Sequence, residues 1–159
     1  MASTHPQAAP YHRPIVISGP SGVGKGTLIQ KLIDSHPGKF SLGFSHTTRK
    51  PRLGEVEGMA YNFVPRSAFL NLLENDSFIE HTYFSGNYCG TSKENIASQQ
   101  KQGSIVLLDI DIEGIKTITK SQSLHARYVF IKPTNFRTLE SRLRARGTEV
   151  SRSKALSLA

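Results

Sequence analysis

A glycine-rich segment between an apolar triplet and a helical pattern constrains this chain more than any other feature. Residues 19–25 read Gly-Pro-Ser-Gly-Val-Gly-Lys, which matches GxxxxGK. The triplet 15–17 in front of it is typical of a buried strand, and apolar residues recur at helical spacing from Leu28 to Ile33. In such a loop, backbone N–H groups and the positive end of the helix converge on phosphate oxygens. The sequence therefore predicts a nucleotide-phosphate site.

The predicted phosphate site includes a cation and a place for magnesium. Its residues are Gly19, Pro20, Ser21, Gly22, Val23, Gly24, Lys25, Gly26 and Thr27. Lys25 is expected to contact the β- and γ-phosphates. A Ser or Thr that binds Mg²⁺ normally follows this lysine, but here Gly26 follows it and Thr27 comes one position later. We therefore expect Mg²⁺ to be held by Thr27 or through water, together with Asp109 at the end of an apolar strand.

Alternating strand and helix patterns predict an α/β fold with a parallel sheet. Buried strands are expected at 15–17, 105–108 and 128–131, and further strands at 78–80 and 82–84. Helices are expected from the glycine loop to Pro37, after a Ser67 cap, from Ser92 to Gly103, around 112–118, and from Leu139 to Gly147. Ligands of such folds bind at the carboxyl ends of the strands. The irregular, polar and turn-rich residues 44–88 are interpreted as a small insertion on this core.

The charge pattern favours anionic ligands bound at two places. The 159 residues suit one domain with a net charge of +8. One basic cluster is Arg49, Lys50 and Arg52, and the other is Arg137, Arg142, Arg144 and Arg146. Two separated clusters fit two phosphate sites better than one long stripe.

Cysteine content and hydropathy exclude several other classes of protein. Cys89 is the only cysteine, which excludes an internal disulfide and a Cys-based zinc site and favours an intracellular protein. No apolar run approaches the length of a membrane span, and residues 1–13 are interpreted as a flexible tail.

The segments that follow the glycine loop resemble the guanylate kinase signature. They are Ser-His-Thr-Thr-Arg-Lys-Pro-Arg at 45–52, Gly54-Glu55, Gly58, Tyr61, Phe63-Val64, Phe78-Ile79-Glu80, Gly86-Asn87-Tyr88, Gly90-Thr91-Ser92 and Leu108-Asp109-Ile110-Asp111. The resemblance runs from Arg13 to about Glu149. It implies a P-loop nucleoside-monophosphate-kinase-like three-layer fold over 14–149, with a parallel sheet core, a GMP-binding insertion at about 44–90 and a partial lid at about 135–149.

The resemblance also implies substrates and roles for individual residues. The substrates would be ATP, with Mg²⁺, and GMP, and the protein would be a cytoplasmic monomer without nucleic-acid or membrane partners. The GMP-binding residues would be Ser45, Arg49, Arg52, Tyr61, Glu80, Thr91 and Asp111, with Glu80 reading the guanine. The catalytic residues would be Lys25, Arg49, Arg142 and Arg146, which neutralise the phosphoryl group being transferred.

The sequence departs from the family pattern at three places. Cys89 stands where the family usually has a tyrosine that contacts the GMP phosphate, and Glu113 replaces a glutamine. The pattern stops after Glu149, and residues 150–159 form a divergent tail. We therefore expect the final strand, the flanking helices and a further lid arginine of the family to be missing, with weak stability and low turnover.

Two other functions remain open at this stage. One is a catalytically weak guanylate-kinase-like binding module that uses the acceptor site for phosphorylated peptides, although such modules typically lose the intact Gly24-Lys25 loop. The other is a nucleic-acid binder, suggested by the net charge of +8. The motifs account for much of that charge, and no pattern of stacking aromatics accompanies it.

Overall fold

The secondary structure alternates between strands and helices along most of the chain. The structure is a computed structural model and describes residues 12–52, 54–59 and 61–145. In chain order the elements are β1 (Ile15–Ser18), α1 (Lys25–Ser35), β2 (Phe40–Leu42), β3 (Ser45–Thr47), β4 (Asn62–Phe63), α2 (Arg66–Glu74), β5 (Phe78–Phe84), β6 (Asn87–Ser92), α3 (Lys93–Lys101), β7 (Ile105–Asp109), α4 (Ile112–Ser121), β8 (Arg127–Phe130) and α5 (Phe136–Ala145). The predictions for residues 1–11, for Arg146 and Gly147, and for the tail at 150–159 lie outside the described residues.

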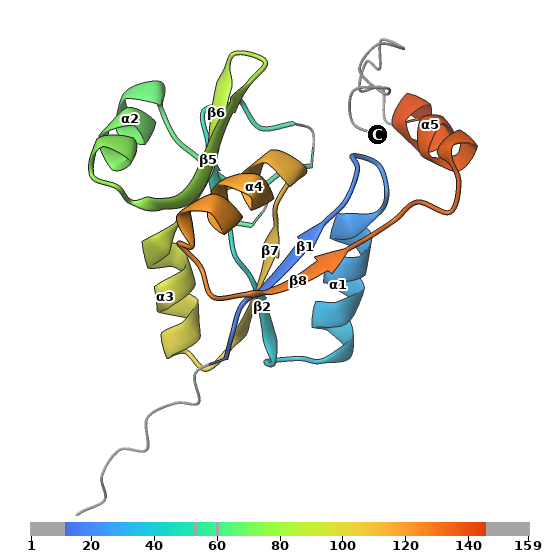
Figure 1. Cartoon of the computed structure of the whole chain (residues 1–159), viewed down its shortest axis with the longest axis horizontal. Helices are drawn as coiled ribbons and strands as arrows, with labels where there is room; N and C mark the ends of the chain where they lie inside the picture. Colours follow the sequence, from blue (N-terminus) through green and yellow to red (C-terminus); the bar gives the residue numbers. More distant parts are fainter. Residues whose placement is uncertain (1–11, 53, 60, 146–159) are drawn as a thin grey trace, which may run out of the picture.

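Four strands form a parallel sheet in the order β2-β7-β1-β8. Successive side chains of a strand point to opposite faces. Val16, Val106 and Leu108 accordingly pack in one core cluster with Ile96 of α3 and Ile118 of α4. On the opposite face, the neighbouring residues Ile17 and Leu107 pack with Ile29 of α1. The sheet therefore lies between two helical layers, which Figure 1 shows, and the predicted α/β fold with a parallel sheet is confirmed.

A second sheet, in the order β4-β3-β6-β5, occupies much of the segment that was expected to be irregular. β6 is antiparallel to both β3 and β5, whereas β3 and β4 are parallel. Residues 78–80 and 82–84 are in strand conformation, as predicted, but they form one strand rather than two, because β5 runs from Phe78 to Phe84. Ser85 (φ 52°) and Gly86 (φ 82°) connect it to β6 with two positive φ angles, which matches the twist of a tight hairpin.

Two local predictions fail for identifiable reasons. Ser67 does not cap α2, because the helix begins at Arg66 and Pro65, in an extended conformation, is its N-cap residue. Strand β8 is not buried: the side chains of Tyr128, Val129 and Phe130 are 47%, 47% and 59% exposed. β8 is the edge strand of the parallel sheet in the described part of the chain, with β1 as its neighbour. The apolar sequence of β8 resembles that of a buried strand, but its side chains are exposed because β8 lies at the edge of the sheet.

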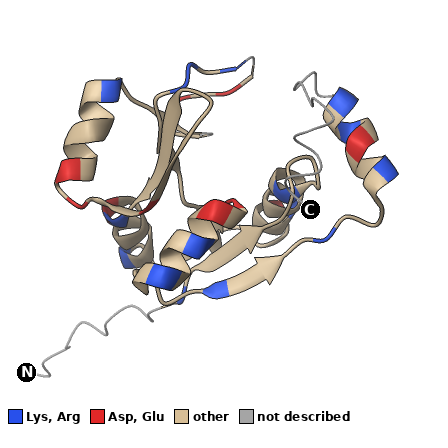
Figure 2. Ribbon diagram, turned by 45° about the horizontal axis from the view of Figure 1, so that its top comes forward, with Lys and Arg blue, Asp and Glu red and all other residues tan. Residues whose placement is uncertain are grey.

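The strand order places the ends of β1 and β7 side by side. Ile17 lies opposite Asp109, so the glycine loop after β1 and the acidic end of β7 meet at one edge of the sheet. Basic residues gather on α5 and in the segment between β3 and β4, two separate parts of the molecule (Figure 2). Among the residues described, no helix is both long and apolar enough to cross a membrane.

Candidate active site

The glycine loop passes from β1 into α1 without a side-chain cap. Gly24 is the N-cap residue of α1 with φ 107°, a conformation that L side chains rarely adopt, and it provides no side-chain cap. Because the first N–H groups of a helix have no partner within the helix, those of α1 can bind a ligand. Gly19 is also required, because a Cβ atom there would lie 2.4 Å from the carbonyl oxygen of Ile131. The loop thus has the backbone conformation of an anion site at a helix N-terminus.

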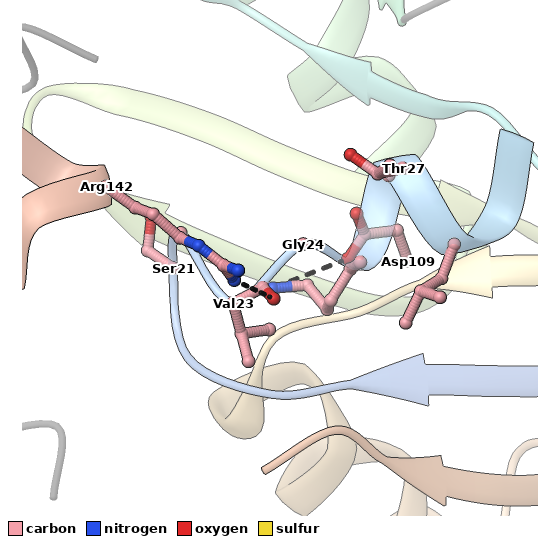
Figure 3. Close-up of a pocket in the computed structure, with 10 residues that line it drawn as sticks. Ser21, Val23, Gly24, Thr27, Asp109 and Arg142 are labelled. Atoms are coloured by element: carbon pink, nitrogen blue, oxygen red, sulfur yellow. Dashed lines mark hydrogen bonds and ion pairs between the residues drawn. The ribbon is translucent and has the colours of Figure 1, made fainter. Parts of the chain in front are cut away.

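A pocket of about 620 Å³ lies on this loop (Figure 3). Its lining comprises Ser21, Gly22, Val23, Gly24, Lys25, Gly26, Thr27, Leu28, Asp109 and Arg142. The ammonium of Lys25 donates to the carbonyl oxygen of Gly19 at 2.8 Å and lies 3.8 Å from a carboxylate oxygen of Asp109. The guanidinium of Arg142 donates to the carbonyl oxygen of Val23 at 3.1 Å. Two cations and one carboxylate from three distant segments therefore converge on the pocket.

Helix α5 contacts the glycine loop directly. A Cβ atom on Gly22 would lie 2.8 Å from Cδ2 of Leu143 and 3.6 Å from Cδ1 of Leu139. This packing places the helix where Arg142 reaches the loop, and Figure 3 shows the Arg142 side chain extending from α5 to Val23. Arg144, two residues further along and therefore on the opposite side of the helix, instead pairs with Glu140 at 2.7 Å, where both side chains are exposed. The predicted lid segment thus contributes one arginine to the pocket among the residues described.

The pocket offers magnesium a partial set of ligands. Thr27 and Asp109 both line it, and the Asp109 side chain is 42% exposed. Within the described ranges no three His, Cys, Asp or Glu side chains gather closely enough to form a metal centre of their own. Mg²⁺ is usually bound by one or two carboxylates plus substrate phosphates and water. One carboxylate and one hydroxyl beside a phosphate loop fit that mode of binding.

A buried carboxylate and two hydroxyl groups form a second cluster, on β3, β5 and β6. Glu80 is 6% exposed, and the hydroxyl of Thr91 donates to its Oε1 at 2.6 Å. The Oγ of Ser45 lies 3.1 Å from that of Thr91. Because Thr91 has a single hydroxyl hydrogen and donates it to Glu80, Ser45 donates to Thr91. Burial, reinforced by the charge of Asp111 and opposed by the Thr91 bond, raises the pKa of Glu80 to about 7.

The first turn of α4 lies against this carboxylate. Asp111 caps the helix, with its Oδ1 accepting from the backbone N–H of Gly114 at 2.8 Å. A Cβ atom on Gly114 would lie 3.0 Å from Oε2 of Glu80. The partly buried Cys89 thiol lies nearby, and burial together with the charges of Glu80 and Asp111 raises its pKa to about 12. The thiol is therefore neutral at physiological pH and adds no charge to the cluster.

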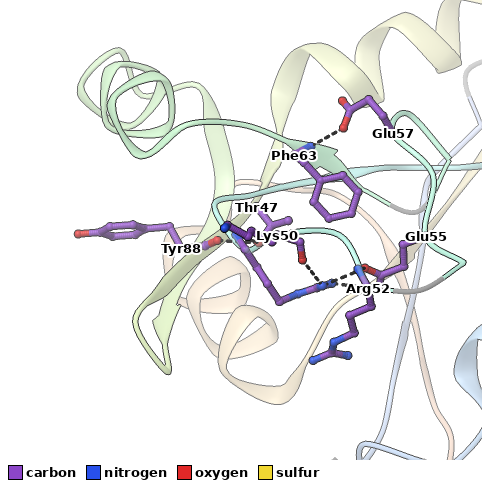
Figure 4. Close-up of polar contacts among 8 residues, drawn as sticks. Thr47, Lys50, Arg52, Glu55, Glu57, Phe63 and Tyr88 are labelled. Carbon is purple, nitrogen blue, oxygen red and sulfur yellow. Dashed lines mark hydrogen bonds and ion pairs between the residues drawn. The ribbon is translucent and has the colours of Figure 1, made fainter.

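Arg49 is held between a carboxylate and two aromatic rings, and Figure 4 labels that carboxylate, Glu55, and one of the rings, Phe63. Its Nη1 and Nη2 donate to the two oxygens of Glu55 at 2.9 and 3.0 Å, and Nη1 also donates to the carbonyl oxygen of Lys50 at 2.8 Å. The guanidinium carbon lies 5.3 Å from the ring centre of Tyr61 and 5.8 Å from that of Phe63. The hydrogen bonds to Glu55 raise the pKa of Arg49, and the same bonds lower the pKa of Glu55. The result is an oriented cation.

Comparison with known proteins decides the family. A profile of the guanylate kinase family matches residues 11–158. The chain belongs to the guanylate kinase family. It is 45% identical over 147 residues to the guanylate kinase of Sus scrofa, which covers 92% of this chain and 74% of the pig protein. It is 47% identical over 137 residues to guanylate kinase 1 of Oryza sativa, which covers 86% of this chain and 36% of the rice protein.

A solved structure shows the same relationship in three dimensions. The crystal structure of guanylate kinase from Anaplasma phagocytophilum superposes with a TM-score of 0.69 at 31% sequence identity. The superposition covers 92% of this chain and 71% of the bacterial chain. The described part of the chain therefore has the guanylate kinase fold, while the chain spans about three quarters or less of the length of these relatives.

Most of the residues that the family resemblance singled out fall into three groups in the structure. Lys25, Asp109 and Arg142 meet at the glycine loop, and Ser45, Thr91 and Glu80 form the buried polar cluster with Asp111 beside it. Arg49 and Tyr61 form the third group, with the exposed Arg52 three residues from Arg49. Arg146 lies outside the described residues. No role was predicted for Glu55, although it contacts both Arg49 and Arg52. Its position three residues after Arg52 and six after Arg49 could have indicated an ion pair.

Proposed function

We propose that this chain is an ATP-dependent guanylate kinase, which transfers the γ-phosphoryl group of ATP to GMP and forms ADP and GDP. The observation that carries the proposal is the coexistence of two sites of different chemistry on one chain. One is a phosphate loop with its lysine in place, and the other is a buried carboxylate bonded to hydroxyls. Phosphate capture alone would need only the first site, and peptide binding would not need the glycine loop.

The donor site is suited to a nucleoside triphosphate. The N–H groups at the start of α1 and the ammonium of Lys25 would bind the β- and γ-phosphates, because charge-assisted hydrogen bonds to phosphate are stronger than those to the carbonyl oxygen of Gly19. Arg142 lines the same pocket and would neutralise charge on the transferred group. Asp109 and Thr27 would hold Mg²⁺ beside the phosphates, where the ion would supply further charge neutralisation.

The acceptor site is suited to a purine that presents two donors. An ionised Glu80 accepts two hydrogen bonds, which matches the N1–H and the amino group of guanine. The hydroxyls of Ser45 and Thr91, with Asp111 nearby, would contact the rest of the base edge. Arg49, Arg52 and Tyr61 would hold the phosphate, because a guanidinium matches phosphate oxygens with two parallel donors.

Catalysis in this arrangement depends on positioning and charge. The attacking oxygen of GMP is already anionic, so strong help from a general base is unnecessary. Lys25, Arg49, Arg142 and Arg146 would neutralise the charge that develops between the two phosphates. Residence of the monomer in the cytoplasm, with no nucleic-acid or membrane partner, stays a prediction that accompanies this proposal.

A coupled ADP-release assay on this chain tests the proposal. ADP should form when MgATP is supplied with GMP, and at no more than background with AMP or without an acceptor. Binding of GMP without GMP-dependent ADP would instead identify a guanylate-kinase-like binding module. Equal rates with AMP and GMP would contradict the role of Glu80.

Activity is expected to fall with acidity because of Glu80. Its pKa of about 7 means that the carboxyl gains a proton as the pH falls, and it then accepts fewer hydrogen bonds. We expect kcat/KM for GMP to fall about tenfold between pH 8 and pH 6, since kcat/KM reports the protonation of the free enzyme. The phosphate of GMP itself titrates near pH 6. The profile of Glu80→Gln corrects for this, because only the wild type contains the additional titration; identical profiles would count against the prediction.

A further inference from the structure

Glu55 makes three hydrogen bonds that join the two arginines of the acceptor site. Its Oε1 accepts from Nη2 of Arg49 at 3.0 Å. Its Oε2 accepts from Nη1 of Arg49 at 2.9 Å and from the backbone N–H of Arg52 at 2.7 Å. The side chains of Arg49 and Glu55 are only 22% and 21% exposed, so this pair is shielded more than an ordinary surface ion pair.

These contacts occupy a particular part of the Arg49 guanidinium. A guanidinium has five N–H donors in a fixed plane. Both hydrogens of Nη1 are used, one by Glu55 and one by the carbonyl oxygen of Lys50 at 2.8 Å, and one hydrogen of Nη2 is used by Glu55. The other hydrogen of Nη2 and the hydrogen of Nε lie side by side on the remaining edge. Within the described part of the chain, the structure gives that edge no partner.

The aromatic rings fix the plane in which this remaining edge lies. Tyr61 and Phe63 contact the guanidinium at 5.3 and 5.8 Å from their ring centres. A ring against the face and a carboxylate on one edge together remove most of the rotational freedom of the group. The entropy of ordering a long side chain is then lost on folding rather than on binding, which strengthens the binding of a later ligand.

We propose that Glu55 is a positioning residue, which holds Arg49 so that its Nε–Nη2 edge faces the acceptor phosphate, and which fixes Arg52 in the same turn. The inference rests on the proposed function, because the ligand of that edge is taken to be the phosphate of GMP. The opposite role is also chemically conceivable: Glu55 could compete with the phosphate for Arg49. The two roles predict opposite changes in GMP affinity when the carboxylate is removed.

Glu55→Gln is therefore the decisive variant. A glutamine has only one acceptor oxygen, so it cannot accept from both Nη1 and Nη2 of Arg49, and the orientation of Arg49 should be lost. We expect KM for GMP to rise about 10- to 100-fold, by more than kcat falls, because small displacements of a positioning group have effects of this size. Affinity for guanosine, which has no phosphate, should stay unchanged. An unchanged or lower KM for GMP, or an equal loss of affinity for guanosine, would overturn the proposal.

Two further variants complete this experiment. Glu74→Gln removes the same charge from the exposed end of α2 and should leave KM for GMP unchanged. If it raises KM as much as Glu55→Gln does, net charge explains the effect and the proposal fails. Glu55→Asp keeps the charge but is one methylene shorter, and it should also raise KM; it serves in the same comparison if Glu55→Gln does not fold. Wild-type ADP release that does not depend on GMP would refute the proposed function instead, so the two failures are distinguishable.

Discussion

Glu80→Gln is expected to lower the preference for GMP over AMP by on the order of 10⁴-fold. A site built to hydrogen-bond one pattern of donors discriminates by about 10⁴ or more against a ligand with another pattern. A glutamine offers one acceptor and one donor, whereas the two guanine groups both donate. Adenine presents an acceptor at N1 and a donor at its amino group, which matches glutamine. The ratio of kcat/KM values for the two acceptors measures the change.

The structure indicates that this substitution leaves the surrounding hydrogen bonds in place. The Thr91 hydroxyl donates to Oε1 of Glu80 at 2.6 Å, so the amide oxygen of a glutamine should take that position. The amide nitrogen then occupies the position of Oε2, beside Gly114. Glu113→Gln, on the exposed side of α4, is the matched control and should leave the ratio unchanged. A variant that folds and still prefers GMP as strongly as the wild type would contradict the assignment of the base site.

Lys25→Met is expected to lower kcat by at least about 10²- to 10³-fold. Removal of one preorganised charge from the transferring group has an effect of this size in other enzymes. Methionine fills much of the volume of lysine, so the glycine loop should keep its backbone. Single-turnover formation of ADP with saturating GMP measures the chemical step without product release.

The Lys25 variant should separate the two sites. GMP binding should be unchanged, because the Lys25 ammonium contacts the carbonyl oxygens of Gly19 and Pro20 and the carboxylate of Asp109, which lie outside the buried cluster around Glu80. Lys31→Met, on the exposed face of α1, is the control for the loss of a charge and should retain full activity. A Lys25 variant with near-normal kcat would place the phosphoryl transfer elsewhere in the protein.

The parallel sheet could be predicted from sequence because its central strands are continuous apolar runs. β1 and β7 are covered on both faces, and their residues Val16, Leu107 and Leu108 are at most 1% exposed. β8 has the same kind of sequence, but its burial depends on which other segments of the chain pack against it. The residues of the strand itself do not reveal those contacts. The second sheet was missed for another reason. β3 and β4 have three and two residues, which are too few to show an alternating pattern in the sequence. They form only through pairing with other strands, as where Ser45 of β3 pairs with Thr91 of β6.

Only the part of the site that lies within one contiguous motif could be predicted from the sequence alone. The glycine loop is contiguous, so residues 19–27 and the cation at position 25 follow from spacing alone. The direction of the hydrogen-bond chain from Ser45 through Thr91 to Glu80 depends on three strands and could not be predicted. The fork between Arg49 and Glu55 likewise requires the turn that brings the two side chains together.

Leu139 and Leu143 of α5 pack closely on Gly22, and this packing brings Arg142 of the same helix to the loop that carries Lys25. A hydrogen atom is all that separates the loop backbone from the helix that carries Arg142, since a Cβ atom at position 22 would come within 2.8 Å of Leu143. A larger side chain at position 22 would also have to adopt the positive φ of 80° found there, and it would force the Leu143 side chain or the helix itself to shift. Gly22, which has no side chain, therefore permits the close approach of α5 that lets Arg142 reach the carbonyl oxygen of Val23 and line the same pocket as Lys25.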